Sequence, residues 1–460
     1  MKEAGYITFH DVECIILEDL DKIYIVPKVL DDIKKLRPFY YNNNFSIEYQ
    51  SSVGLNRYCY IESSEINSDY GVELMPQYKI CNYREKNFTG LEITGDAIDD
   101  FFQPVKYISR CKTASCVDGN SNNLLYSRIC VDQWTFKYSE KEISVSLFCG
   151  NVLSMGLLSD LKVHSKLQVK FPVTSEIDDL YRIYLVIIRF LKLVRYDNSV
   201  GMLRTTVFSG IDENCVTNGY LIDYINKNEI GLRNFSHEYS NFKPFISKFL
   251  QFAADNSDYD FRHFISGGFK IRGKNYTILD FLYIFGAFEQ EFNKQAKKTV
   301  ATHESLKQKE IKEKIIEYIE GFNDPNNNNE VNEFICNAKG RISQLGTQMG
   351  QTGKIVNAYE QVRTALDSSL KNIFFFKSIT VCKSLEDKQV KKIANYLADT
   401  RGKITHGCFD LVFSDEEAQK IRFLEILTYA LLLRRLNMTD EEIEKIIGAV
   451  FMCNYVLAGV

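Results

Sequence analysis

The sequence predicts an α+β protein, in which a β-rich N-terminal domain is followed by an all-α helical bundle. Apolar residues alternate with polar ones in the first 172 residues, and after about residue 241 they recur every three or four residues. Of the 460 residues, 45% are apolar, which is enough to build more than one hydrophobic core. We therefore expect two domains, at residues 1–240 and 241–460.

Strands are predicted wherever the N-terminal part shows a period of two. Ile143, Val145, Leu147 and Cys149 alternate with polar residues, which places one face of a strand in a core. Further short stretches that fit strands are 23–26, 58–61, 167–171 and 203–208.

One buried helix is predicted to close this domain. Ser175 is a suitable N-cap, and the acidic residues Asp178 and Asp179 behind it suit the positive end of a helix dipole. Up to about Arg195 the segment is apolar almost all round, which is typical of a helix buried against a sheet.

Helices follow one another in the C-terminal part. Their predicted ranges are 276–299, 305–322, 331–349, 354–376, 385–401, 415–436 and 439–456. Thr439 followed by Glu442 predicts a capping box at the start of the last helix. We expect these helices to pack as one bundle.

The charge and cysteine content exclude several classes of protein. The chain has 56 basic and 60 acidic side chains, so any contact with RNA or DNA requires a local patch. The 12 cysteines occur singly, without zinc-finger spacing, which favours free thiols in a reducing compartment. Neither a signal segment nor an apolar run of roughly 20 residues is recognised, so we expect a cytoplasmic protein without a membrane partner.

The motifs of many nucleotide-dependent and metal-dependent enzymes are absent from the sequence. There is no phosphate-binding loop, no dinucleotide-binding motif, no HExxH zinc motif and no GxSxG hydrolase motif. Five histidines have no organised neighbours in the sequence, and we interpret them as structural: His10, His164, His237, His263 and His303. We expect no cofactor and no metal ion.

The sixth histidine follows an arginine at the end of a predicted helix. Arg401 and His406 form an R-x4-H pattern. In a continuous helix the two residues would differ by about 140° in direction and by about 7.5 Å along the axis, so they would flank one groove. Gly402 and Gly407 favour a break in the helix, which would bring the two side chains closer.

These two residue types suit the cleavage of a phosphodiester without a metal ion. The guanidinium of Arg401 matches phosphate oxygens and stays charged, and the imidazole of His406 exchanges a proton near neutral pH. RNA is cut when a base removes its 2′-hydroxyl proton and a cation stabilises the phosphorane. One arginine and one histidine make half of such a catalytic site. A two-fold dimer would supply two arginines and two histidines.

A local excess of positive charge surrounds this pattern. Residues 383–403 contain six basic and three acidic residues, a net charge of +3. Lys388, Lys391 and Lys392 are the expected contacts with a nucleic-acid backbone. An R-x4-H pattern also arises by chance, so a salt-bridged arginine and a helix-capping histidine form an alternative interpretation.

The pattern and its place in the chain resemble a known superfamily. An R-x4–6-H pattern in a C-terminal helical bundle is the signature of HEPN proteins, and the order of the two halves is similar to that of ApeA-like anti-phage proteins. The residues that carry the resemblance are Gly90–Gly95 (GLEITG) and Leu397–Gly407 (LADTRGKITHG). The resemblance implies a homodimer through the C-terminal domain, with Arg401 and His406 as the catalytic pair in a shared cleft.

One residue departs from the pattern of this superfamily. HEPN nucleases often have a polar residue directly after the arginine, and here that residue is Gly402. Asn395, Asp399 or Thr405 would then supply the hydrogen bond to the imidazole, and Lys403 would add positive charge.

The resemblance implies a metal-independent RNA endonuclease that acts as an abortive-infection effector against phage. The N-terminal domain would sense a phage-derived trigger or restrain the nuclease. Two other interpretations stay open. One is a non-catalytic HEPN module that binds nucleotides or a partner protein, and the other is a scaffold in which the R-x4-H pattern is fortuitous.

Overall fold

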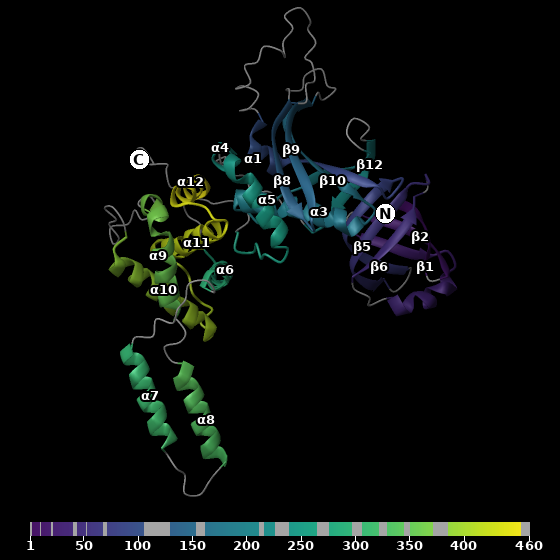
Figure 1. Ribbon diagram of the computed structural model, residues 1–460. Helices are drawn as coiled ribbons and strands as arrows, with labels where there is room; N and C mark the ends of the chain where they lie inside the picture. The colour runs from purple at the N-terminus through teal and green to yellow at the C-terminus, as the bar shows by residue number, and fades with distance from the viewer. Residues whose placement is uncertain are drawn as a thin grey trace, which may run out of the picture. The chain divides into compact units, whose positions relative to one another are not determined.

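A computed structural model of the chain shows two compact units, Met1–Phe269 (unit 1) and Lys270–Val460 (unit 2) (Figure 1). The residues that it describes are 2–9, 11–19, 22–39, 44–51, 53–67, 71–104, 129–152, 162–210, 216–225, 239–264, 276–296, 306–321, 329–344, 350–370 and 385–451. Each unit is considered by itself below.

Unit 1 is built on one antiparallel sheet, which confirms the β-rich N-terminal part. Its described strands are β1 (Lys2–Phe9), β2 (Val12–Asp19), β3 (Lys22–Pro27), β4 (Phe45–Gln50), β5 (Asn56–Asn67), β6 (Gly71–Tyr83), β7 (Phe88–Gly95), β8 (Ile129–Tyr138), β9 (Lys141–Val152), β10 (Lys162–Thr174), β11 (Leu203–Ser209) and β12 (Val216–Asp223). Their spatial order is β3-β2-β1-β4-β5-β6-β12-β11-β7-β10-β9-β8. The predicted strands lie within β3, β5, β9, β10 and β11.

The first six strands of unit 1 close on themselves. β3 pairs with β2 along one edge and with the first part of β6 along the other, where Ile23–Ile25 faces Val72–Leu74. The second part of β6, Tyr78–Cys81, pairs with β12. A single long strand therefore belongs both to the closed part of the sheet and to its open part.

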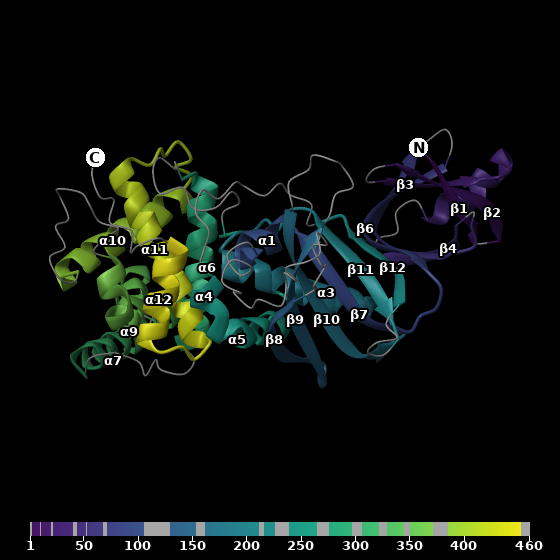
Figure 2. The same cartoon turned by 90° about the horizontal axis from the view of Figure 1, so that it is seen from above.

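Helices cover part of the open sheet (Figure 2). The helical segments of unit 1 are η1 (Leu30–Phe39), α1 (Asp96–Phe102), α3 (Ile177–Arg195), α4 (Tyr239–Phe242), η4 (Lys243–Phe245) and α5 (Ile246–Asp255). As predicted, α3 is buried on almost all sides, because β10, α1 and α5 all contact it. The predicted N-cap is wrong by one residue: Glu176 occupies that position, and its N–H donates to the Thr174 hydroxyl (3.2 Å).

The boundary between the units differs from the expected one at residue 240. α5 contacts α3 and β8, so the first helices after residue 240 belong to unit 1. Gln251 on α5 also caps the edge strand β8, since its side-chain amide exchanges two hydrogen bonds with the backbone of Lys137 (2.9 and 3.1 Å). The amide thus replaces a further strand at this edge.

Unit 2 is all-helical in its described residues, as predicted. Its helices are α6 (Ile278–Ala296), α7 (Leu306–Glu320), α8 (Asn329–Gln344), α9 (Gln351–Leu370), α10 (Asp387–Thr405), α11 (Asp415–Arg435) and α12 (Asp440–Phe451). α11 is the central helix: it contacts α6, α9, α10 and α12, and nearly all of 421–433 is buried. The predicted capping box is confirmed by reciprocal bonds between Thr439 and Glu442 (2.9 and 3.3 Å).

Two further observations concern the apolar character of the helices and the cysteines. In the described ranges no helix combines the length and the apolar character that crossing a membrane requires. The cysteines in those ranges are free thiols, as expected. Six predicted helix limits lie outside the described residues: Thr299, Ser305, Phe322, Met349, Phe376 and Val456.

Candidate functional site

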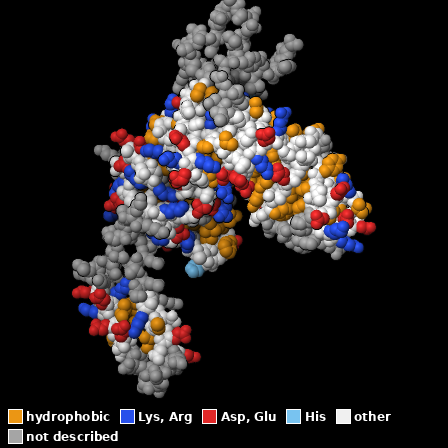
Figure 3. All heavy atoms as spheres, turned by 45° about the vertical axis from the view of Figure 1, so that its right-hand side comes forward, with side chains coloured by type: hydrophobic (Ala, Val, Ile, Leu, Met, Phe, Trp, Pro, Cys, Tyr) orange, Lys and Arg blue, Asp and Glu red, His pale blue; other side chains and the backbone are white. Residues whose placement is uncertain are grey.

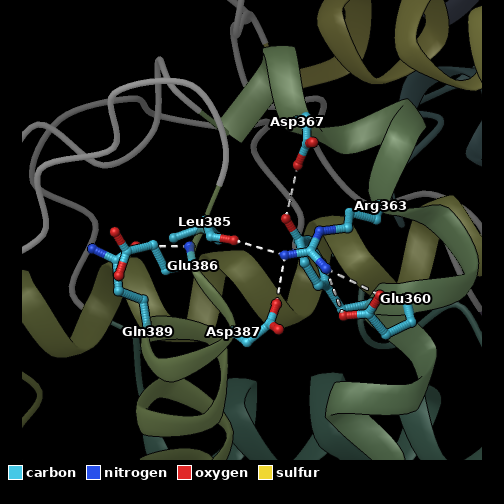
Figure 4. Close-up of polar contacts among 8 residues, drawn as sticks. Glu360, Arg363, Asp367, Leu385, Glu386, Asp387 and Gln389 are labelled. Carbon is cyan, nitrogen blue, oxygen red and sulfur yellow. Dashed lines mark hydrogen bonds and ion pairs between the residues drawn. The ribbon is translucent and has the colours of Figure 1, made fainter.

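The candidate site is built on α10, whose first turn is firmly anchored. Glu386 and Gln389 form a capping box at its start. Arg363 on α9 donates to the carbonyl of Leu385 (3.1 Å) and to the carboxylate of Asp387 (2.6 Å), as Figure 4 shows. This end of α10 therefore has a structural role.

The packing of α10 follows from its apolar spacing. Val390, Ile393, Leu397 and Ile404 recur at helical spacing and are all buried. The opposite face points to solvent and includes the sequence-predicted residues other than Arg401, which lies toward α6 with only about a third of its side chain exposed. The helix thus presents one continuous polar face along its whole length.

The far end of α10 differs from the expectation. The helix does not break at Gly402 but continues to Thr405, with His406 as its C-cap. Gly407 has a φ of +93°, its N–H donates to the Ile404 carbonyl (3.0 Å), and the Cys408 N–H donates to the Lys403 carbonyl (3.1 Å). These two bonds and the left-handed glycine define a Schellman motif, so the helix ends at a fixed residue.

Arg401 is held by one carboxylate from another helix. Its Nη2 lies 3.2 Å from Oε2 of Glu289 on α6, and its guanidinium lies 5.5 Å from the ring centre of Phe285. The other oxygen of Glu289 accepts a hydrogen bond from Gln351 (2.5 Å). Only one hydrogen bond of the Arg401 side chain is found among the described residues, and about a third of that side chain is exposed. Since a guanidinium has five N–H donors, several remain for a phosphate.

His406 is exposed at the end of the same helix. Because α10 is continuous here, the directions of Arg401 and His406 differ by about 140° and the residues lie about 7.5 Å apart along the axis. Within one chain they therefore flank the end of α10, and they are not brought closer by a break.

The residues predicted to orient the imidazole lie elsewhere on α10. The Thr405 hydroxyl donates to the Arg401 carbonyl (2.8 Å), so it is engaged within the helix. Asp399 and Asn395 are exposed on the same face as His406, but they precede it by about 10 Å and 16 Å along the axis. In one chain neither is within hydrogen-bond distance of that ring.

The predicted lysines form an exposed basic face. Lys388, Lys391, Lys392 and Lys403 are all exposed, and no ion pair is found for them among the described residues. Helical geometry places Lys388 and Lys392 within about 40° of the direction of His406. A strand of nucleic acid lying along α10 would therefore meet lysines first and the imidazole at the end. Lys383, the sixth basic residue of the run, lies outside the described residues.

A second set of polar side chains lies between α10 and α11, formed by Tyr396, Glu417 and Lys420. The Lys420 ammonium lies 4.4 Å from the ring centre of Tyr396, and burial followed by the hydrogen bond to Glu417 raises the pKa of that tyrosine. Burial would raise the pKa of Glu417, but hydrogen bonds from Ser414 and Tyr396 lower it overall. Tyr396 therefore stays protonated and Glu417 stays ionised at neutral pH.

Several residues of the site were not found from the sequence. Glu289, Phe285 and Gln351 contact Arg401 or its partner, yet they lie far from it in the chain. Glu291, two residues further along α6, is buried and pairs with Arg435 on α11 (2.8 Å). No local pattern marks Glu289 as the partner of Arg401, because the two residues are 112 positions apart.

Two of the other histidines are placed by the structure. His164 contacts the Asp99 carboxylate (2.6 Å), and His263 is buried beside Tyr259 (3.3 Å). His10, His237 and His303 lie outside the described residues. In the described part of the chain no cluster of three or more His, Cys, Asp or Glu is arranged to hold a metal ion.

Comparison with known proteins identifies no relative. No protein-family model matches the chain, no curated protein matches it, and no solved structure matches it. The two stretches that carry the resemblance are both described: Gly90–Gly95 ends β7, and Leu397–Gly407 forms the end of α10.

Proposed function

We propose that the chain is a metal-independent RNA endonuclease of the HEPN type. The observation that carries this proposal is the end of α10, where an exposed imidazole and a partly engaged guanidinium follow a face of unpaired lysines. Neither a buried structural histidine nor a fully paired arginine would leave both groups available to one ligand.

The catalytic step needs a second copy of the chain. Within one chain Arg401 and His406 point to different flanks of α10. A two-fold axis beside this end would place His406 of one subunit opposite Arg401 of the other, and would create two equivalent sites. Homodimerisation through unit 2 is therefore part of the proposal.

In each composite site the imidazole removes the proton of the ribose 2′-hydroxyl. The 2′-oxygen then attacks the adjacent phosphorus, while the guanidinium stabilises the negative charge of the phosphorane. The bond from phosphorus to the 5′-oxygen breaks, and the imidazolium returns a proton to that oxygen. The products are a 2′,3′-cyclic phosphate and a 5′-hydroxyl end.

The direct test is RNA cleavage by the purified full-length chain in EDTA. Arg401→Ala and His406→Ala should each abolish cleavage, whereas His164→Ala and Arg262→Ala, which change surface residues of unit 1, should not. The wild type should leave cyclic phosphate ends and spare a substrate with 2′-deoxyribose at the cleaved position. Full activity in His406→Ala would refute the proposal.

We further propose that cleavage serves defence against phage, with unit 1 responding to a phage-derived trigger. The resemblance to ApeA-like proteins supports this role. Phage should form fewer plaques on cells that express the wild type than on cells without the protein. Cells that express His406→Ala should show no such reduction. Equal protection by both forms would separate defence from cleavage.

A non-catalytic HEPN module is the second candidate. The observation that favours it is the missing orienting group: among the described residues no side chain is bonded to the imidazole of His406. In that case the dimer would bind RNA or nucleotides and leave RNA intact.

A further inference from the structure

The helix pair α7–α8 has an exposed apolar face that the proposed nuclease site does not use. α7 and α8 contact each other, and Lys339 on α8 pairs with Glu320 on α7 (3.3 Å). None of their described residues is buried. Helices of this length depend on packing for their stability, so a hairpin without a buried residue requires a partner surface.

The apolar stripe of α7 does not face α8. Ile316 and Ile319 are partly buried and mark the side that contacts α8. Ile311, Ile315 and Tyr318 follow the i, i+4, i+7 spacing and lie about 100° away from that side. Their exposed fractions are 58%, 43% and 82%.

α8 extends this stripe with one aromatic side chain. Val331, Ile335 and Ile342 are partly buried and mark its side toward α7, and Phe334 lies about 80° away from them with 74% of its surface exposed. Because the two helices run antiparallel (Figure 1), these rotations bring Phe334 and the α7 stripe to the same face of the hairpin. In Figure 3, hydrophobic side chains lie along the middle of the hairpin between charged ones.

The charges of the hairpin are divided between its two ends. Residues 315–320 and 329–338, near the connection, contain four glutamates and no basic residue. Residues 306–314 and 340–344, at the other end, contain four lysines and one arginine against two glutamates. Lys339 lies between the two ends, where it pairs with Glu320. The hairpin is thus acidic at one end, basic at the other, and apolar in between.

We propose that the hairpin pairs with the hairpin of a second copy of this chain to form an antiparallel four-helix bundle. A two-fold axis through the middle of the stripe places each acidic end on the basic end of the other copy. It also covers Ile311, Ile315, Tyr318 and Phe334 with the same residues of the partner. A parallel arrangement would place like charges together, so the charge pattern selects the antiparallel one. This association does not depend on catalysis by Arg401 and His406.

Sedimentation of the full-length chain tests the stripe. The wild type should be a dimer at tens of micromolar. Ile315→Glu combined with Tyr318→Glu should weaken association on the order of a hundredfold, because each substitution acts twice in a two-fold interface. Ile315→Ala with Tyr318→Ala should weaken it less, and Glu313→Gln, on the opposite face, should not. Identical sedimentation of the wild type and the double glutamate variant would overturn the proposal, because the apolar stripe would then not lie in the interface between the two copies.

Charge exchange tests the antiparallel arrangement. The basic variant is Glu317→Lys, Glu330→Lys and Glu333→Lys. The acidic variant is Lys309→Glu, Lys312→Glu and Lys314→Glu. Each variant alone should associate more weakly than the wild type, because like charges meet at both ends of the hairpin. A mixture of the two should form mixed dimers. Failure of the mixture to associate, with both variants folded by circular dichroism, would contradict the antiparallel bundle.

Discussion

Two histidines in this chain have opposite surroundings, His263 in unit 1 and His406 in unit 2. His263 is buried, its Nε2 lies 3.3 Å from the Tyr259 hydroxyl, and the ring of Phe264 lies 4.4 Å from its own. His406 is exposed beyond the last turn of α10, the helix whose other flank carries Arg401 paired with Glu289. The comparison teaches that access to solvent, rather than the residue type, distinguishes a candidate catalytic imidazole from a structural one.

The largest expected effect is the loss of RNA cleavage when the exposed histidine, His406, is replaced. His406→Gln should lower RNA cleavage by about 10²- to 10⁴-fold, the usual contribution of a general acid or base. Because the side chain is exposed, the melting temperature should stay unchanged. Cleavage rates and thermal unfolding of the full-length chain check both statements. Loss of fold along with activity would indicate a structural role instead.

The second prediction concerns the buried histidine. Burial lowers the pKa of His263 to about 4 despite the nearby carboxylate of Asp260. The unfolded chain therefore binds a proton at this histidine near pH 6.5, whereas the folded chain binds it only near pH 4. The free energy of unfolding consequently decreases as the pH falls from about 6.5 to 4, by about 3 kcal/mol at most.

Unfolding by denaturant at several pH values measures this effect. His263→Gln should remove most of the pH dependence between pH 6.5 and 4, whereas His164→Gln should retain it. An unchanged slope in His263→Gln would show that another group controls stability in acid.

A smaller effect is expected from the basic face of α10. Replacing Lys388, Lys391 and Lys392 with alanine should weaken RNA binding roughly tenfold at low salt. It should also reduce the slope of log affinity against log salt by about 2, because each lost phosphate contact contributes about 0.7 for a single strand. Lys248→Ala in unit 1 is the matched control. A slope equal to that of the wild type would exclude these lysines from the interface.

The smallest effect concerns the carboxylate that holds Arg401. Glu289→Gln removes a negative charge that competes with phosphate for the guanidinium, so RNA should bind about threefold more tightly. Cleavage should not rise in proportion, because the same contact positions the arginine. Fluorescence anisotropy with a labelled RNA measures the change, and weaker binding would show that Glu289 mainly positions Arg401 for the ligand.

Local patterns in the sequence were sufficient for much of this picture. Periodicity predicted five of the twelve described strands of unit 1 and the helices of unit 2. The capping pair Thr439 and Glu442 was confirmed because its signal lies within four residues. The C-terminal end of α10 could also be predicted, since Arg401 and His406 lie on a single helix. Such features depend on neighbours in the chain.

Long-range pairing was beyond the sequence. The Glu289–Arg401 contact joins residues that are 112 positions apart, and nothing local marks it. β6 pairs with β3 in its first part and with β12 in its second part, and no local pattern in the sequence predicts these two partners. The unit boundary was misplaced because α5 has the same helical periodicity as the bundle, although it packs on α3 and β8.

The central claim is that an arginine and a histidine from different subunits make one catalytic site. Mixing Arg401→Ala and His406→Ala subunits tests it most directly. After exchange, half of the dimers should be mixed, and each mixed dimer should contain one intact site out of two, so cleavage should recover to about a quarter of the wild-type rate. A mixture that forms mixed dimers and still does not cut RNA would contradict the account.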